Sequence, residues 1–429
     1  MTITEKILAQ HAGKSQVSPG DKIWIEVDLL LTHDVCGPGT ISIFKNEFGP
    51  ESKVWDKEKI VIIPDHYIFT QDTHAKRNIE VLREFARQQH ITHFYDVDSP
   101  RYKGVCHVAL AEEKFTRPGQ VLLGTDSHTC TSGAFGMFAT GIGNTDAAFV
   151  MGTGRLWVRV PETLKYIIND TIPDYVMAKD VILHIIKDIG IAGATYKAME
   201  FSGEAIRNMS REERMTLCNM VVEAGAKNGI IAPDKVTSDY FSPDTEEFSE
   251  WQYEGDDEEY AGITEYSGTL FEPLVAEPYC PDNVTPAHQL NHIKLDQAYI
   301  GSCTGGKITD FLAAAKILKD KKVVIKTKGV PATMMVKETI EEQKLDGKSV
   351  YQILEEAGVE MGPPSCAACL GGPEDTFGRL QGKEVCISTT NRNFPGRMGS
   401  PDSKTYLASP LTVAASALTG KITDPREYL

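Results

Sequence analysis

The sequence predicts an α/β protein in which helices cover each sheet. Strand-like and helix-like segments alternate from one end of the 429-residue chain to the other, a pattern typical of layered α/β domains. Apolar residues make up 41% of the chain, which is enough for substantial cores. Polar side chains directly follow several predicted strands, the position where α/β proteins bind their ligands. We therefore expect ligand-binding groups to gather beyond the strand ends.

The first predicted domain spans residues 1–161. Short apolar runs predict strands at 22–27, 60–63, 93–97 and 120–123. A helix is predicted over 74–89, because apolar residues recur there at helical spacing. The domain is expected to end after the glycine-rich segment 141–154, just before the strand-like residues 164–168.

Two further domains are predicted at residues 162–285 and 286–429. In the second domain, helices are expected at 177–189 and 210–227. In the third domain, strands are expected at 299–302, 322–327 and 384–389. The boundary between them is expected to follow an acidic segment and the proline-containing stretch 277–286.

The chain is acidic, with a net charge of −16, which argues against nucleic acid as a partner. Part of this charge lies in a run of nine acidic residues without one Lys or Arg. Like charges repel and stay in water, which favours a solvated loop over a metal site or a partner surface. The run comprises Asp244, Glu246, Glu247, Glu250, Glu254, Asp256, Asp257, Glu258 and Glu259.

The sequence also indicates the cellular compartment. The N-terminal segment has no apolar stretch of signal-peptide length, and no apolar run approaches the roughly 18 residues that span a bilayer. We therefore expect a cytoplasmic protein with no membrane partner. The nine cysteines are scattered along the chain. In a reducing compartment they are better interpreted as thiols or metal ligands than as a disulfide framework.

Two cysteines three positions apart, Cys366 and Cys369, form the first chemical motif. Such a pair can be a redox dithiol, half of a zinc site or part of an iron–sulfur site. Cys303, in the glycine-rich sequence GSCTGGK after a predicted strand, is a third candidate ligand. Three cysteines around a [4Fe–4S] cluster leave one iron free to act as a Lewis acid. A zinc protein that uses the same three cysteines is the alternative.

Acidic residues stand close to histidines at two predicted strand ends. Asp65 and His66 follow one strand, and Asp126 and His128, separated by a serine, follow another. His107 lies nearby in the sequence GVCHVAL. A carboxylate beside a histidine raises the pKa of the imidazole and fixes its tautomer, as a general acid requires. These histidines are therefore candidate acid–base groups.

The loop sequence NRNFPGR begins at Asn391 and presents two guanidinium groups, Arg392 and Arg397. Each can hold a carboxylate through two parallel hydrogen bonds, and surface salt bridges are the alternative. Soft metal ligands beside carboxylate-binding arginines indicate a metal centre that handles a small anionic substrate.

With these residues in place, the chain resembles the aconitase superfamily along nearly its whole length. The motifs that carry the resemblance are PDH at 64–66, GVCHVAL at 104–110, GTDSHTCTSGAFG at 124–136, MTLCNMVVEAGA at 215–226, IGSCT at 300–304, SCAACLGG at 365–372, STTNRNFPGRMG at 388–399 and YLASPLTVAASALTG at 406–420. Length and ending are similar to those of the large subunits of 3-isopropylmalate dehydratase and homoaconitase. The resemblance implies three α/β/α domains of aconitase type around a central cleft. The swivelling fourth domain of aconitase would be absent and supplied by a separate small subunit.

The resemblance also implies a cofactor and an acid. Cys303, Cys366 and Cys369 would ligate one [4Fe–4S] cluster per subunit, whose open iron takes the hydroxyl and one carboxylate of a small dicarboxylate substrate. His66, oriented by Asp65, would protonate the departing hydroxyl.

Further roles follow from the same resemblance. Asp126 would pair with His107, and Glu223 with His128, around the iron-bound oxygen. In the family, the serine that removes the carbon-bound proton lies on the swivel domain, so this chain alone would be chemically incomplete. Substrate contacts are implied for His33, Ser127, Asn391, Arg392 and Arg397.

Two departures from the family pattern bear on the substrate rather than on the chemistry. Gly305 and Lys307 stand where the family usually has Asn and Arg, and the segment 33–40 differs from the usual version. The first candidate substrate is 3-isopropylmalate, in leucine biosynthesis. A 2,3-dimethylmalate dehydratase and a homoaconitase large subunit are the alternatives. The competing class is a non-enzymatic iron-responsive binding protein, which the superfamily also contains.

Overall fold

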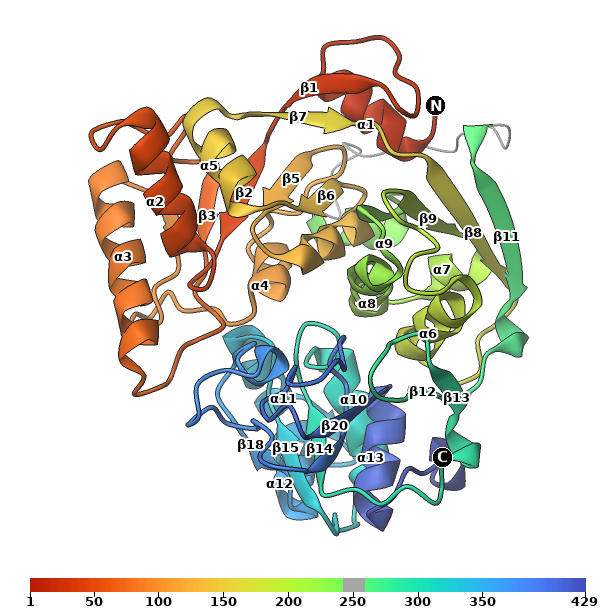
Figure 1. Cartoon of the computed structure of the whole chain (residues 1–429). Helices are drawn as coiled ribbons and strands as arrows, with labels where there is room; N and C mark the ends of the chain where they lie inside the picture. The colour runs from red at the N-terminus through yellow and green to blue at the C-terminus, as the bar shows by residue number, and fades with distance from the viewer. Residues whose placement is uncertain (242–258) are drawn as a thin grey trace.

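The computed structural model describes residues 1–241 and 259–429 of the chain. Three α/β bodies lie around the middle of the molecule: the N-terminal body in red to yellow, the second in green and the C-terminal body in blue (Figure 1). Of the acidic run predicted to be a solvated loop, only Glu259 falls within these residues, and its carboxylate pairs with the N-terminal amino group of Met1. None of the described helices combines the length and the apolar character needed to cross a bilayer.

The first body contains a parallel five-stranded sheet with the strand order β4-β3-β2-β5-β6. Alternate strand residues face opposite sides: Leu30 and Ile62 pack under α2, α3 and α5, while Leu31 and Val61 pack under α4. Strands β1 and β7 form a separate antiparallel ribbon. The elements are α1 (Ile3–His11), β1 (Lys22–Glu26), β2 (Leu29–Thr32), α2 (Gly37–Phe48), β3 (Ile60–Ile62), α3 (Thr73–Gln89), β4 (His93–Phe94), α4 (Cys106–Glu112), β5 (Val121–Gly124), the 3₁₀ helix η1 (Ser127–Phe135), β6 (Phe138–Gly141), α5 (Asn144–Thr153) and β7 (Arg155–Arg159).

The second body contains a parallel four-stranded sheet with the order β10-β9-β8-β11. Its core packs strand residues such as Tyr166 and Phe201 against α6 and α8, and the same apolar cluster extends to Cys303 and Cys369 of the third body. The elements are β8 (Thr163–Asn169), α6 (Ala178–Ile189), β9 (Ala198–Ser202), α7 (Glu204–Asn208), α8 (Arg211–Asn219), the 3₁₀ helix η2 (Met220–Ala224), β10 (Asn228–Ile231), α9 (Lys235–Phe241) and β11 (Gly262–Ser267).

The third body contains a seven-stranded sheet with the order β13-β12-β20-β19-β14-β15-β18, of which the last five strands are parallel. Strands β12 and β13 add an antiparallel edge, although both begin before the domain boundary predicted near residue 285. The elements are β12 (Leu274–Ala276), β13 (Val284–Pro286), β14 (Gln297–Ile300), α10 (Ile308–Leu318), β15 (Lys326–Gly329), α11 (Met334–Glu342), the hairpin β16 (Lys344–Leu345) and β17 (Lys348–Ser349), α12 (Val350–Ala357), β18 (Glu360–Met361), β19 (Val385–Ser388), β20 (Lys404–Ala408) and α13 (Pro410–Thr419).

The predicted elements are largely confirmed. The strand expected at 299–302 is displaced to 297–300, and three further differences follow. The strand expected at 322–327 begins only at Lys326, because the backbone N–H groups of Val323 and Val324 bond the carbonyls of Ala357 and Ala417 at the ends of α12 and α13. The strand expected at 93–97 is limited to β4.

The third difference concerns the helix expected at 210–227. It divides into α8 and the 3₁₀ helix η2, which ends at Gly225 with φ 84° in the left-handed region. Glu223 lies in this 3₁₀ segment.

Candidate active site

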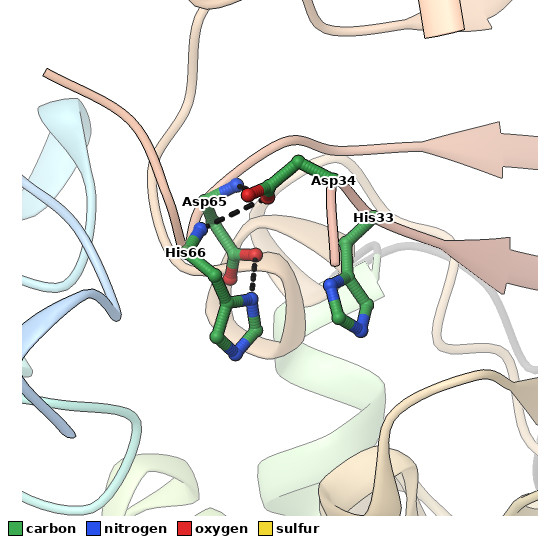
Figure 2. Close-up of side chains that lie close together, drawn as sticks. All are labelled: His33, Asp34, Asp65 and His66. Atoms are coloured by element: carbon green, nitrogen blue, oxygen red, sulfur yellow. Dashed lines mark hydrogen bonds and ion pairs between the residues drawn. The ribbon is translucent and has the colours of Figure 1, made fainter. Parts of the chain in front are cut away.

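Two loops at the carboxyl ends of neighbouring parallel strands present the first cluster. His33 and Asp34 follow β2, and Asp65 and His66 follow β3 (Figure 2). Asp34 Oδ1 accepts the backbone N–H of Asp65 at 2.9 Å and that of His66 at 3.0 Å. Asp34 Oδ2 accepts the backbone N–H of Tyr67 at 2.6 Å. The fully buried Asp34 carboxylate thus fixes the loop that presents His66.

The His66 imidazole is held in its protonated form. Its Nδ1 lies 2.6 Å from Asp65 Oδ1, and the other oxygen of Asp65 accepts the backbone N–H of Cys106 at 2.8 Å. Burial disfavours the imidazolium, but the carboxylates of Asp65, Asp126 and Asp34 outweigh burial and raise the pKa of His66 to about 10. At neutral pH, Nδ1 therefore donates to Asp65, and Nε2 carries a second proton that a general acid can release.

His33 lies against this imidazolium and stays neutral. The two ring centroids are 4.4 Å apart. Burial, reinforced by the charge of His66, lowers the pKa of His33. His33 Nε2 is buried, lies 3.9 Å from Asp126 Oδ2 and has no hydrogen-bond partner among the described residues. It is therefore available to a ligand.

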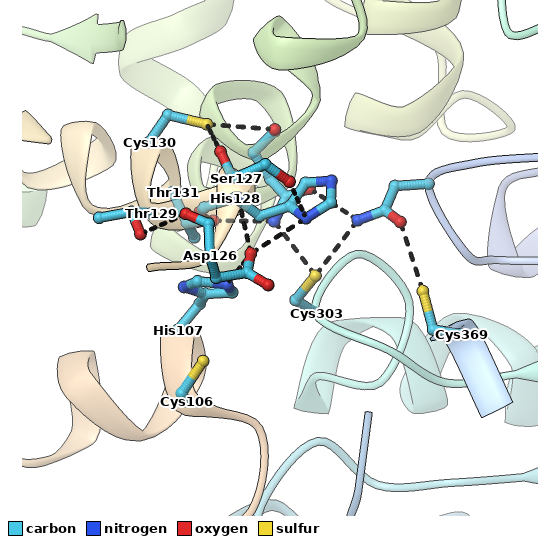
Figure 3. Close-up of polar contacts among 12 residues, drawn as sticks. Cys106, His107, Asp126, Ser127, His128, Thr129, Cys130, Thr131, Cys303 and Cys369 are labelled. Carbon is cyan, nitrogen blue, oxygen red and sulfur yellow. Dashed lines mark hydrogen bonds and ion pairs between the residues drawn. The ribbon is translucent and has the colours of Figure 1, made fainter. Parts of the chain in front are cut away.

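Asp126 is the hub of a second cluster (Figure 3). It follows β5 and caps η1, where its Oδ1 accepts the backbone N–H of His128 at 2.7 Å. The same oxygen lies 2.9 Å from His107 Nε2 and 3.3 Å from His128 Nδ1. Burial opposes ionisation of Asp126, but His107 and His128 hold its pKa well below the usual range. Ser127 is half-buried, with its hydroxyl 3.5 Å from His128 Nδ1.

A chain of contacts links all three bodies. His128 Nε2, from the first body, lies 3.0 Å from Glu223 Oε1, in the second. Arg392 Nε, from the third, donates to both oxygens of Glu223, at 2.9 and 3.0 Å. Burial opposes ionisation of Glu223, but His128 and Arg392 lower its pKa. Glu223 is therefore a carboxylate that orients both partners.

The three candidate cysteine ligands are buried in the third body. Two side-chain amides face the sulfur of Cys303: Asn219 Nδ2 at 3.1 Å and Asn391 Nδ2 at 3.4 Å. Asn391 Oδ1 lies 3.4 Å from the sulfur of Cys369. The structure thus brings Asn391, predicted to bind substrate, to the cysteines. Amide N–H groups that face sulfur stabilise its thiolate form.

Arg397, predicted to bind a substrate carboxylate, also reaches this group. Its side chain is buried, and Nη2 lies 3.9 Å from the sulfur of Cys369. The neighbouring Cys366 thiol and the Arg397 guanidinium hold the pKa of Cys369 well below its usual range, against the effect of burial. Arg397 Nε is buried with no hydrogen-bond partner among the described residues.

The cysteine loop and the acid loop are joined directly. The backbone N–H of Cys366 donates to the carbonyl of Asp65 at 2.7 Å. Further along both loops, Asp375 accepts the hydroxyl of Thr70 and the backbone N–H of Gln71. The imidazolium and the thiol cluster therefore occupy one site, built from loops that are far apart in the sequence.

Comparison with known proteins identifies the family. The model described as "Aconitase family (aconitate hydratase)" matches residues 5–290 and 277–420. The chain belongs to the aconitase family. It is 55% identical to the chloroplastic 3-isopropylmalate dehydratase large subunit of Arabidopsis thaliana, over 100% of this chain and 87% of that protein. It is 44% identical to 3-isopropylmalate dehydratase large subunits of Aquifex aeolicus and Pyrococcus furiosus, over 100% of this chain and 98% and 99% of those proteins.

The family implies an iron–sulfur cluster, and the donor set fits one. Among the described residues, the groups whose ligand atoms all lie within 4.8 Å of one another are two histidine–carboxylate clusters, and the three cysteines do not form such a group. One zinc ion with Zn–S bonds of about 2.3 Å would hold its sulfur ligands only about 3.8 Å apart. The three sulfurs are therefore not placed around a single zinc ion in this structure.

Two residues of this site were absent from the sequence-based set. Asp34 anchors the acid loop, and Asn219 faces Cys303. Each had a signal in the sequence: Asp34 is adjacent to His33, as Asp65 is to His66, and Asn219 lies within the motif MTLCNMVVEAGA. The strand before Asp34, β2, was not predicted, and only the packing shows what the two residues contact.

Proposed function

We propose that this chain is the large catalytic subunit of a [4Fe–4S]-dependent hydro-lyase that dehydrates and isomerises 3-isopropylmalate in leucine biosynthesis. The observation that carries the proposal is that a proton-donating imidazolium and the candidate cluster ligands lie in one buried site. The His66 imidazolium and the Cys366 loop are connected through a single residue, Asp65. The relatives named as 3-isopropylmalate dehydratase large subunits, aligned over the whole chain, support the choice of substrate.

The proposed roles follow from the contacts. Cys303, Cys366 and Cys369 would hold the cluster, which supplies a Lewis acid for the hydroxyl and one carboxylate of the substrate. His66 donates its Nε2 proton to the departing hydroxyl, which leaves as water. Asp65 accepts the hydrogen bond from Nδ1–H of His66 and stabilises the imidazolium until the Nε2 proton is transferred.

Substrate binding uses buried polar atoms that have no protein partner among the described residues. Arg397 Nε, His33 Nε2 and His107 Nδ1 are buried without a partner among the described residues. A buried unpaired polar group costs about 1–3 kcal/mol, so a polar ligand that bonds these atoms recovers that cost. Arg392, held by Glu223 through Nε, can present its outer nitrogens to a carboxylate. Ser127 would contribute a further hydrogen bond.

Among the described residues of the site, the acid is His66, and the carboxylates of Asp126 and Glu223 are engaged by cationic partners. Asp126 and Glu223 are ion-paired carboxylates with lowered pKa values, and His66 is already protonated. We therefore propose that the small subunit, which the "large subunit" names of the relatives imply, supplies the base that removes the carbon-bound proton. The active species would be a heterodimer, in the reducing cytoplasm that cluster thiolates require.

Of the two departures from the family pattern, Gly305 and Lys307 are packed against other residues, whereas the segment 33–40 contributes His33 to the site. Lys307 is buried, with Nζ 2.7 Å from Asp310 and 3.3 Å from the carbonyl of Cys303. Gly305 packs against Thr389, where an added Cβ would lie 2.0 Å from the hydroxyl. Neither position adds a side chain among the histidines and arginines.

The test is a substrate panel under anaerobic conditions. The chain is reconstituted with iron and sulfide, combined with its small subunit and assayed with 3-isopropylmalate, 2,3-dimethylmalate and homocitrate by the ultraviolet absorbance of the alkene product. We expect turnover of 3-isopropylmalate to exceed that of the other two substrates. Preferred turnover of 2,3-dimethylmalate or homocitrate would reassign the substrate, and an inactive, colourless complex would refute the proposal.

A further inference from the structure

A buried lysine hydrogen-bonds to the loops that carry Cys303 and Asn391. Lys179 lies in the first turn of α6, and 1% of the residue is exposed. Its Nζ donates to the hydroxyl of Thr304 at 3.2 Å and to the carbonyls of Thr389 at 2.7 Å and Thr390 at 2.5 Å. These contacts use all three donors of an ammonium group. No acidic side chain in the described part of the chain forms an ion pair with it.

The three partners of Lys179 belong to the two loops that build the site. Thr304 directly follows Cys303, and Thr389 and Thr390 directly precede Asn391. The hydroxyl of Thr304 also donates to the carbonyl of Thr389 at 2.8 Å. One ammonium group from the second body therefore ties the cysteine loop to the arginine loop of the third body.

These loops pack with no spare room. A Cβ added at Gly305 would lie 2.0 Å from the hydroxyl of Thr389, which itself accepts the backbone N–H of Gly301 at 2.9 Å. A displacement of either loop therefore moves the other. The amide contact between Asn391 and Cys303 depends on the same register.

The position is unfavourable for a cation unless negative charge lies nearby. Burial, with the neighbouring Lys307, lowers the pKa of Lys179 to about 7. A cation in the first turn of a helix also faces the positive end of the helix dipole. The groups that favour its charged form are Cys303, Cys369 and Asp310. Asp310 already pairs with Lys307 at 2.7 Å, so the Lys179 ammonium group relies on its three oxygen partners.

We propose that Lys179 is a positioning residue of this site. It holds the Cys303 loop against the Asn391–Arg392 loop through the three hydrogen bonds of its ammonium group. This inference rests on the proposed function, because it requires that the three cysteines hold a cluster. The Nζ of Lys179 hydrogen-bonds to threonines, and Lys179 does not touch the substrate.

The test compares Lys179→Met with Lys187→Met, the same change at an exposed position of the same helix. Both variants are reconstituted and combined with the small subunit. The readouts are iron and sulfide per chain, the midpoint potential of the cluster from dithionite titrations followed by electron paramagnetic resonance, and kcat. We expect Lys179→Met to shift the potential to more negative values, since loss of a nearby cation disfavours the reduced cluster. We also expect kcat to fall about 10- to 100-fold through misplacement of the loops.

Lys187→Met should match the wild type in every readout. A Lys179→Met complex with the wild-type potential and kcat would overturn the proposal. If Lys179→Met does not fold, Thr304→Val tests the positioning role. This variant keeps the charge of Lys179, so the midpoint potential should stay unchanged while kcat falls. An unchanged kcat would overturn the positioning role. A colourless wild-type complex would refute the cluster and this inference with it, whereas an unaltered variant in a cluster-bearing background would refute the inference alone.

Discussion

His66 must keep a proton in a buried place where an imidazolium is costly. Three carboxylates, from Asp65, Asp126 and Asp34, meet that requirement, and Asp65 does so at 2.6 Å. The neighbouring His33 is kept neutral because burial and the positive charge of His66 lower its pKa. Two adjacent imidazoles thus have different protonation states at neutral pH, a separation that acid catalysis requires.

Replacing His66 by Gln should abolish turnover and keep the cluster. The side chain remains polar, but no proton donor of suitable pKa is left, so kcat should fall about 10²- to 10⁴-fold. The measurements are kcat with 3-isopropylmalate and iron content per chain. His93→Gln, in β4 of the same body, is the matched control and should leave both unchanged. An active, cluster-bearing His66→Gln enzyme would remove His66 from its proposed role.

The same residue makes stability depend on pH. The pKa of His66 rises from about 6.5 in an unfolded chain to about 10 in the fold, so its stabilising effect is fully present below about pH 6.5 and is lost as the pH rises through about 10. Urea unfolding of the cluster-free chain should show the largest difference in unfolding free energy between wild type and His66→Gln near pH 6. That difference should shrink steadily towards pH 10. A constant or growing difference would contradict the assigned protonation state.

Cys303→Ser should prevent assembly of a stable cluster, because a hydroxyl does not replace a thiolate ligand at neutral pH. The control is Cys386→Ser, a buried cysteine whose sulfur contacts the carbonyl of Ile387 instead of the site. Visible absorbance and sulfide analysis after reconstitution distinguish the two variants. Equal cluster content in both would exclude Cys303 as a ligand.

Sequence motifs anticipated much of the residue-level geometry. The pairs Asp65–His66 and Glu223–His128, implied by the family resemblance, lie within hydrogen-bond distance in the structure, while their catalytic roles stay predictions. Arg392 and Arg397 were expected to bind substrate carboxylates. In the structure they contact Glu223 and Cys369 respectively, because buried guanidinium groups must find partners in the protein as well.

At the scale of elements, the site depends on short loops after parallel strands. The loop after β3 is held by Asp34 from the loop after β2, through three backbone N–H groups. Such an arrangement follows from topology, since the carboxyl ends of β2 and β3 are neighbours. Alternation in the sequence predicted β3 but missed β2, and it does not show which strands are neighbours.

Asp34→Asn tests this anchor. The amide keeps the size of the side chain but replaces one acceptor oxygen by a donor, so one backbone N–H loses its partner. We expect a loss of about 1–3 kcal/mol in unfolding free energy and a kcat about tenfold lower through misplacement of His66, with iron content unchanged. The control Asp96→Asn alters a partly exposed ion pair with Arg83 and should cost less than about 1 kcal/mol. Wild-type activity and stability in Asp34→Asn would show that the loop does not need this anchor.

The misplaced strand at 322–327 shows why element boundaries were harder to predict. The run KVVIKT is apolar and β-branched, as a strand should be. Yet the N–H groups of Val323 and Val324 are taken by the carbonyl ends of α12 and α13. Tertiary contacts of this kind override local preference, and no pattern within the run reveals them.

At the scale of the whole molecule, the three bodies each contribute a necessary part. The first supplies His66 and Asp126, the second Glu223 and Asn219, and the third the cysteines and arginines. The α/β class was predictable from alternation, and the family from motifs spread along the chain. The family resemblance also implied that these parts meet in one cleft, but the contacts that join the bodies could not be predicted, because they depend on packing between sheets that are distant in the sequence.

The decisive measurement is Mössbauer spectroscopy of the chain reconstituted with ⁵⁷Fe and combined with its small subunit, before and after addition of 3-isopropylmalate. Three cysteine ligands leave one iron of the four without a protein ligand, so we predict that the signal of one iron shifts on addition of substrate while the other three stay unchanged. A spectrum in which no iron responds to an actively converted substrate would contradict the assignment of this site as a cluster that binds its substrate directly.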